Sequence, residues 1–267
     1  MKKLQYTKTN ALLEKSIPDY RSVKKIKRKG RPKETADREF DMRREVLTED
    51  LKKLYTVNDM VKTDCGGCTG CSQCCSGMGE SIVLDPYDSY CLSAGLGIAF
   101  PDLVGRFVEW NLVDAVVLPN LMMQGKEEKC AFLAENGRCC IHDFRPGICR
   151  MFPLGRYYEE DGSFRYFLQS RECPKENKTK IKISKWLGIP NLKRYEDYIM
   201  KWHGLLEEVR ELTQQAKDEQ LTKELTVYLL NTCYLTPYHE NTDFYDQFEE
   251  RYHRMKKLLQ VLSQKSE

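Results

Sequence analysis

Clustered cysteines are the feature that most constrains how this chain can fold. Eleven of its twelve cysteines lie between Cys65 and Cys173, and five of these fall within residues 65–75. Two cysteines separated by two residues can bind one metal ion through both thiolates, so a series of such steps predicts an array of metal ligands. The sequence therefore predicts metal binding first, and catalysis only second.

Length and composition limit the class of protein. With 267 residues the chain can form one large domain or two smaller ones, and either can bury a core. No apolar stretch is long enough to span a membrane, and the N-terminus lacks the apolar segment of a signal peptide. We therefore expect a soluble cytoplasmic protein. Thiols stay reduced in the cytoplasm, which favours metal ligands over disulfides.

Composition divides the chain into three regions. Residues 1–64 hold no cysteine and predict a basic arm followed by a helix over 38–61. Residues 65–175 predict a cysteine-cluster domain, and residues 176–267 a helical region packed on it. The expected fold class is α+β, in which a cysteine-rich core of loops and short strands is flanked by N- and C-terminal helices.

Local patterns predict several further elements. Within the cysteine-rich region we expect short helices over 85–95 and 101–110, a strand over 112–118, and a hairpin joining 155–158 to 165–168. The C-terminal region has apolar side chains at helical spacing in two segments, with a third candidate helix over 221–235 between them. The two apolar faces consist of Tyr195, Ile199, Trp202, Leu206, Val209 and Leu212, and of Phe244, Phe248, Tyr252, Met255, Leu259 and Leu262.

The N-terminal region carries a concentration of positive charge. Eight basic residues lie within 21–33, although the net charge of the whole chain is only +3. The segment 29–33, Lys-Gly-Arg-Pro-Lys, resembles the core of an AT-hook, which lies in a narrow minor groove. A solvated basic arm is the favoured interpretation, and nucleic-acid binding ranks last among the functions considered.

Known catalytic and cofactor motifs fit the chain poorly. The run of C-x2-C steps resembles a bacterial ferredoxin loop, but its last gap is short and Cys75 is followed by serine. The radical-SAM spacing C-x3-C-x2-C is absent, because Met78 occupies its third position. No Rossmann turn, P-loop or H-E-x-x-H motif is present. Catalytic and cofactor-binding residues are therefore not assigned.

The second group of cysteines supplies a more specific pattern. A C-x-F-L segment begins at Cys130, a Gly-x-Cys turn ends at Cys139, and R-P-x-x-C-R-x-F-P spans residues 145–153. Together with the C-x2-C-C segment at 71–75, this order resembles the YkgJ-type cysteine-cluster family, a CxxCxxCC zinc- or iron-chelating domain. The resemblance covers about residues 65–175.

The resemblance implies a ligand set. Six cysteines match the family pattern directly, and Cys68 and Cys173 are added from spacing and from the end of the module. Cys65, Cys140 and His142 remain alternatives, the histidine either as a ligand or as a hydrogen-bond partner of a thiolate. Cys91 and Cys233 stand alone in helical segments and are expected to be buried apolar residues. The predicted metal ligands are Cys68, Cys71, Cys74, Cys75, Cys130, Cys139, Cys149 and Cys173.

The identity of the metal stays open between iron and zinc. Eight thiolates could form two zinc sites, or one 4Fe–4S cluster and one zinc site. The cysteine run favours 4Fe–4S, because no four-ligand zinc spacing stands out. Five arginines fall in the same stretch, and some are expected to offset thiolate charge: Arg138, Arg145, Arg150, Arg156 and Arg165.

Three functions are compatible with these observations. Flagellin lysine N-methylases carry the same cysteine domain, so the resemblance implies S-adenosylmethionine as a cofactor and flagellin as a protein partner. The alternative is a non-catalytic iron–sulfur or zinc module that carries electrons or recruits a partner. The third is a nucleic-acid-binding protein that uses the basic arm.

Overall fold

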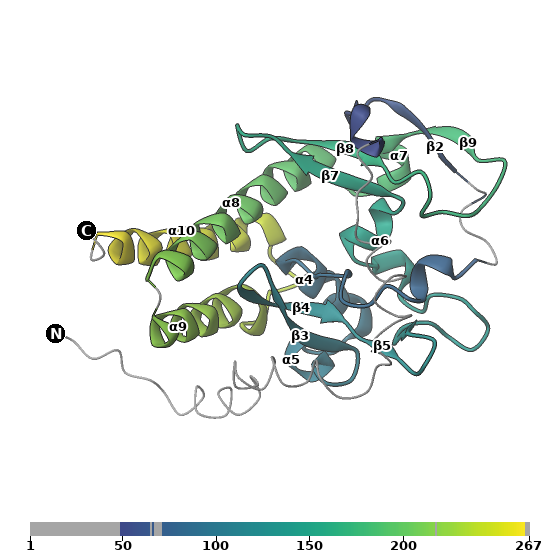
Figure 1. The fold of residues 1–267 in the computed structure, drawn as a ribbon. Helices are drawn as coiled ribbons and strands as arrows, with labels where there is room; N and C mark the ends of the chain where they lie inside the picture. The colour runs from purple at the N-terminus through teal and green to yellow at the C-terminus, as the bar shows by residue number, and fades with distance from the viewer. Residues whose placement is uncertain (1–48, 65, 67–70, 217, 265–267) are drawn as a thin grey trace, which may run out of the picture.

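A computed structural model describes residues 49–64, 66, 71–216 and 218–264 of the chain (Figure 1). The long helices α8, α9 and α10 gather on one side, and the strand pairs and cysteine-bearing loops lie mainly on the other. The predicted α+β class is confirmed. The basic segment 21–33 lies outside the described residues, as do Cys65 and Cys68. The predicted domain boundaries stay predictions.

The described strands form small antiparallel sheets rather than one large sheet. One sheet has the order β1-β8-β7, and the others are the pairs β2-β9, β3-β4 and β5-β6. The strands are β1 (Leu54–Tyr55), β2 (Met60–Asp64), β3 (Val108–Val113), β4 (Val116–Leu121), β5 (Met123–Gln124), β6 (Lys129–Cys130), β7 (Leu154–Tyr158), β8 (Phe164–Leu168) and β9 (Thr179–Lys182). The β7–β8 pair is the hairpin expected from the sequence.

Three of the described helices, α4, α9 and α10, begin where an acidic side chain accepts a hydrogen bond from a free backbone N–H group. Asp218 caps α9 and Asp243 caps α10 in this way. The helices are α4 (Pro86–Leu96), α5 (Phe100–Leu103), α6 (Gly147–Met151), α7 (Ile183–Leu187), α8 (Leu192–Ala216), α9 (Glu219–Leu230) and α10 (Phe244–Ser263). Short 3₁₀ turns are η1 (Asp50–Lys52), η2 (Gln73–Cys75) and η3 (His142–Phe144), and η4 (Asn231–Leu235) is a π-helical turn.

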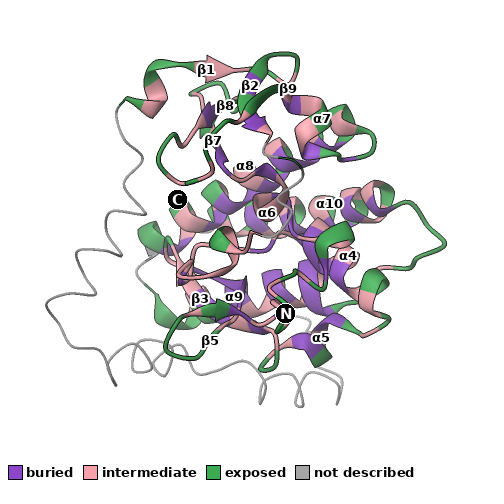
Figure 2. Cartoon of the chain, turned by 90° about the vertical axis from the view of Figure 1, so that its right-hand side faces the viewer, coloured by how far each residue is buried: buried purple, intermediate pink, exposed green. Residues whose placement is uncertain are grey.

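The core lies between the C-terminal helices and α4 (Figure 2). The predicted apolar faces of α8 and α10 point into it: Trp202 and Val209 are buried on α8, and Phe248 and Met255 on α10. Removing these side chains from water drives the packing of the helices. Among the described residues, no helix is both long enough and apolar enough to cross a bilayer.

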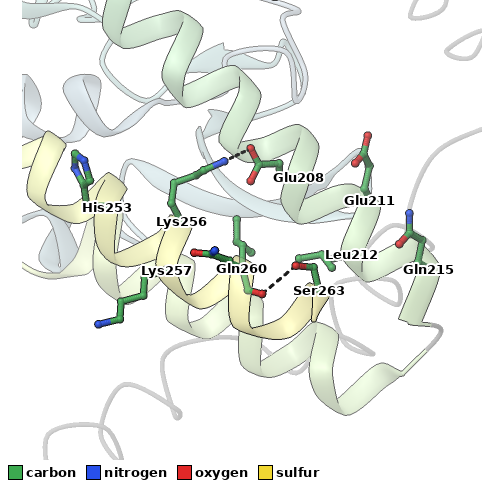
Figure 3. A pocket seen from close by; sticks show the side chains of 10 residues that line it. Glu208, Glu211, Leu212, Gln215, His253, Lys256, Lys257, Gln260 and Ser263 are labelled. Carbon is green, nitrogen blue, oxygen red and sulfur yellow. Dashed lines mark hydrogen bonds and ion pairs between the residues drawn. The ribbon is translucent and has the colours of Figure 1, made fainter. Parts of the chain in front are cut away.

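A groove of about 720 Å³ runs between α8 and α10 at the end near the C-terminus (Figure 3). Leu212 and Leu259 contribute apolar surface, and polar side chains surround them. Lys256 on α10 forms an ion pair with Glu208 on α8. No cysteine lines this groove, so it lies apart from the candidate metal centre.

The predicted helix over 38–61 is wrong where the structure describes it. Residues 49–61 form η1, β1 and the start of β2, whereas 38–48 lie outside the described residues. The Asp59 carboxylate accepts hydrogen bonds from Thr56 N at 2.7 Å and from Thr56 Oγ1 at 2.9 Å. This local turn competes with helical hydrogen bonding, and the flanking residues pair with distant strands.

Two elements predicted inside the cysteine-rich region are also corrected, while the helix over 85–95 is confirmed as α4. The helix expected over 101–110 ends at Leu103, and Gly105 then takes a φ of +81° that a helix cannot contain. The strand expected over 112–118 is a hairpin that reverses at Asp114 and Ala115. Both turn residues have positive φ, which their side chains did not predict.

Candidate metal centre

Four short segments bring cysteines together from distant parts of the chain. Cys74 and Cys75 lie on η2, Cys130 ends β6, Cys139 follows in a loop, and Cys149 lies on α6. None of these segments is long enough to be stable alone, so their arrangement depends on contacts among them.

Backbone hydrogen bonds align the first two segments. Ser76 forms an antiparallel bridge with Lys129, and Gly77 N donates to Glu128 O at 2.9 Å. Since Ser76 follows η2 and Lys129 precedes Cys130, this pairing brings the first cysteine cluster to the β5–β6 hairpin.

The loop after β6 folds back on itself. Leu133 forms a bridge with Cys139, and Cys140 N donates to Phe132 O at 2.9 Å. These bonds return the chain to the neighbourhood of Cys130. The Gly-x-Cys turn of the sequence pattern therefore brings Cys139 close to Cys130, which lies nine positions earlier.

The cysteine segments surround one cavity of about 300 Å³. All six cysteines that match the sequence pattern line it, and apolar side chains such as Ile82 and Leu121 complete its wall. The six are Cys71, Cys74, Cys75, Cys130, Cys139 and Cys149. The structure therefore brings these six predicted ligands together.

The other cysteines differ in position. Cys173 is not among the residues that line the cavity, and Cys68 lies outside the described residues. Cys140 is exposed and does not line the cavity, although Cys139 beside it does. Cys233 is fully buried, as expected for an apolar role, whereas Cys91 is only partly buried.

Four of the cavity thiols disfavour ionisation when no metal is present. Burial raises the pKa of Cys130, Cys139 and Cys149, and neighbouring thiols raise it further. The largest cause of the raised pKa of Cys74 is a hydrogen bond with Cys75, and the second is burial. We call these four cavity thiols, whose pKa values are raised, the quartet: Cys74, Cys130, Cys139 and Cys149.

Arg145 lines the cavity and its positive charge acts on two members of this quartet. Its guanidinium opposes the rise in pKa at both Cys74 and Cys139. Other arginines have different roles: Arg165 forms an exposed ion pair with Glu159 at 2.9 Å. Arg156 does not line the cavity and donates to Tyr195 Oη at 2.9 Å. The expectation that some arginines offset thiolate charge therefore applies best to Arg145.

The loop that carries Arg145 is held by its own side chains. Arg145 Nη1 donates to His142 O at 3.2 Å and also contacts His142 Nε2. Arg150 Nε donates to Arg145 O at 3.1 Å, and its Nη2 donates to Asp143 O. Burial and the charge of Arg145 lower the pKa of His142, so its neutral form is favoured.

Trp186 is a cavity residue that the sequence patterns did not single out. It lies on α7, beyond the last predicted ligand, and its ring lines the cavity beside Phe152. The indole Nε1 is shared between Met151 O at 3.3 Å and Phe152 O at 3.2 Å. A lone tryptophan in a helix gives no signal of this role, because only the packing of α7 against α6 places it there.

The donor set fits a thiophilic metal centre. Soft thiolates select zinc or iron–sulfur clusters over hard cations such as magnesium. Among the described residues, no three Cys, His, Asp or Glu side chains are arranged as a ready site for a single ion. The thiols instead line the wall of a cavity. Their chemistry and their number fit a metal centre bound by thiolates.

Metal binding at these thiols is expected to release protons. Their raised pKa keeps them protonated near neutral pH, so a metal must displace protons, and its affinity should fall as the pH falls. Adding zinc to metal-free protein in weak buffer with an indicator dye measures this directly. Cys140→Ser should release as many protons as the unmodified chain. Zinc binding without proton release would contradict the prediction.

A family model matches the part of the chain that forms this cavity. Residues 67–174 match the CxxCxxCC model, described as a “Putative zinc- or iron-chelating domain”. This segment is a CxxCxxCC domain. No curated protein and no solved structure gave a significant match to the chain.

The CxxCxxCC domain contains all six cavity cysteines, so its identification supports metal binding by zinc or iron. The surrounding chain also contributes to the cavity. Trp186 lies beyond the matched residues, and β2, which precedes them, pairs with β9, which follows them. The metal centre is therefore built partly by segments outside the domain.

Proposed function

We propose that the CxxCxxCC domain holds a 4Fe–4S cluster in the cysteine cavity. The observation that carries the proposal is the lining of one cavity by six thiols. Four cysteine thiolates suffice for such a cluster. The quartet of Cys74, Cys130, Cys139 and Cys149 provides that number, and Arg145 lines the same cavity and can offset negative charge.

The arrangement of the thiols favours a cluster over a lone zinc ion. Zinc held at about 2.3 Å by four sulfurs requires all four to converge on one point. A cluster instead spreads its four ligands over its corners, so thiols placed around a cavity of about 300 Å³ suit it. Cys71 and Cys75, together with Cys68 and Cys173, remain as candidates for a second centre, which could be zinc.

Metal and sulfide analysis tests this proposal. Protein purified without oxygen should be brown, with iron and acid-labile sulfide in about equal amounts and a broad visible absorption band. When bound, the cluster would supply electron transfer or a site that organises substrate. Colourless protein that contains zinc but neither iron nor sulfide would replace the cluster with a zinc centre.

We further propose that the metal centre serves a protein lysine N-methylase of the flagellin type. The motif resemblance supports this activity, and so does the opening of the cavity at the exposed residues Arg138, His142 and Asp143. A purely structural metal site is closed, with all its positions filled by protein. A metal centre that binds a further ligand needs such an accessible opening.

Two measurements distinguish the methylase from a non-catalytic module. Metal-replete protein should bind S-adenosylmethionine in calorimetry and transfer its methyl group to lysine in flagellin, as detected by mass spectrometry. Failure to bind the donor would favour the alternative, an iron–sulfur or zinc module that carries electrons or recruits a partner.

A further inference from the structure

A buried carboxylate lies behind the wall that carries Cys149. Asp88 on α4 is 3% exposed, and its Oδ1 accepts a hydrogen bond from Gly147 N at 2.8 Å. Its Oδ2 accepts another from Asp85 N at 3.1 Å. A carboxylate is rarely buried unless it has partners, and here the partner from outside α4 is the first residue of α6.

Gly147 also lies directly against α8. A Cβ atom at this position would lie 2.3 Å from Tyr195 Oη, so only glycine fits. Tyr195 is fully buried, and Arg156 Nη2 donates to its hydroxyl at 2.9 Å. The start of α6 is therefore clamped between a carboxylate on α4 and a phenol on α8.

The helices that form this clamp are fixed to each other. Tyr198, one turn after Tyr195 on α8, donates to Asp85 Oδ1 at 3.1 Å, and its hydroxyl accepts a bond from Tyr87 N at 3.0 Å. These bonds lock the start of α4 to α8. The clamp thus connects the C-terminal helical region, which lies beyond the CxxCxxCC domain, to the metal cavity.

Helix α6 has only five residues, and Cys149 is its third. A helix this short has little stability of its own, so its position is set by what holds its ends. Displacement of Gly147 therefore displaces the Cys149 thiol by a similar amount.

We propose that Asp88 and Tyr195 are positioning residues for the metal centre: they clamp Gly147 and thereby hold the Cys149 thiol at the cavity. The proposal rests on the metal binding proposed above. The clamp gives α8, which lies outside the matched domain, a direct part in metal retention.

Replacement of Asp88 tests the first half of the clamp. Asp88→Leu should lose its metal to a chelator about 10–100-fold faster than the unmodified chain, because outer partners of a metal ligand affect affinity by this factor. Asp88→Asn keeps an oxygen that can accept a hydrogen bond from Gly147 N. Its rate of metal loss should therefore stay near that of the unmodified chain. Glu196→Gln is the matched control, since the hydrogen bond given for Glu196 on α8 comes from Tyr166 on β8 and not from α6.

A double substitution tests the second half. Gly147→Ala should weaken metal retention, because its Cβ meets the Tyr195 hydroxyl. Adding Tyr195→Phe removes that oxygen and leaves the nearest ring carbon at 3.5 Å, an ordinary contact, so retention should partly recover. Melting curves of the full-length variants, and the visible spectrum of the bound metal or of cobalt(II) substituted for it, separate a moved ligand from a general loss of fold.

The outcomes are distinguishable. If the unmodified protein holds no metal, the proposed function fails. If it holds metal and Asp88→Leu retains it equally well with the same spectrum, the clamp is disproved. Absence of any recovery in the Gly147→Ala and Tyr195→Phe double variant would remove Tyr195 from the proposal.

Discussion

Cys149→Ser is expected to reduce metal retention by more than about 100-fold, beyond the range seen for outer partners of metal ligands. The Cys149 thiol interacts with those of Cys130, Cys74 and Cys139, so its loss removes one of the four proposed cluster ligands. Serine is nearly the same size but does not provide a thiolate. Metal per chain, measured by mass spectrometry after a chelator wash, gives the result.

Cys140→Ser is the matched control for this experiment. Cys140 is exposed and does not line the cavity, although it lies next to Cys139. The control should keep its metal content. If both variants lose metal to the same extent, or if Cys149→Ser keeps it, the ligand set proposed here is wrong.

Arg251→Ala is expected to lower the free energy of unfolding by about 1.5–3 kcal/mol, the range for hydrogen bonds made by a charged group. Arg251 on α10 is 7% exposed. It donates to Thr232 O at 3.1 Å, Thr236 O at 2.8 Å and Pro237 O at 2.7 Å, and its guanidinium lies 3.5 Å from the centroid of the Tyr238 ring. Removing it leaves the carbonyls at the end of η4 without these donors.

Denaturant unfolding followed by circular dichroism measures this change. Arg254→Ala on the same helix is the control, because its ion pair with Glu250 is exposed and 3.8 Å long. The free energy of unfolding of the Arg254→Ala variant should stay within about 0.5 kcal/mol of that of the unmodified chain. Equal stability of the Arg251→Ala and Arg254→Ala variants would show that the bonds to η4 contribute little.

Much of the fold was predictable from local patterns. The apolar faces of α8 and α10 repeat at helical spacing over long segments, and such long periodic patterns are the most reliable signals in a sequence. The β7–β8 hairpin was predictable because Asp161 and Gly162 mark its turn between two aromatic strands. The helix α4 was predictable because Asp85 and Pro86 start it and Gly97 ends it.

The errors have a common physical cause. The segment 49–61 contains helix-compatible residues, but β1 and β2 form because β8 and β9, more than a hundred positions away, offer strands to pair with. The hairpin at Asp114 and Ala115 lacks the glycine or asparagine that usually marks such a turn. In the tertiary structure Arg210 on α8 forms an ion pair with Asp114 at 3.2 Å.

The chemistry of the candidate site can be inferred from the cysteine pattern alone. Cysteine spacing and the motif around Cys149 predicted a thiophilic metal centre and named the six cysteines that line one cavity. Tertiary structure alone decided what surrounds them: Trp186 at the wall, Arg145 beside the thiols, and Asp88 and Tyr195 behind α6. Ligand identity is encoded locally because a motif fixes which atoms are available. Their orientation depends on helices far apart in the chain, whose packing no local spacing encodes.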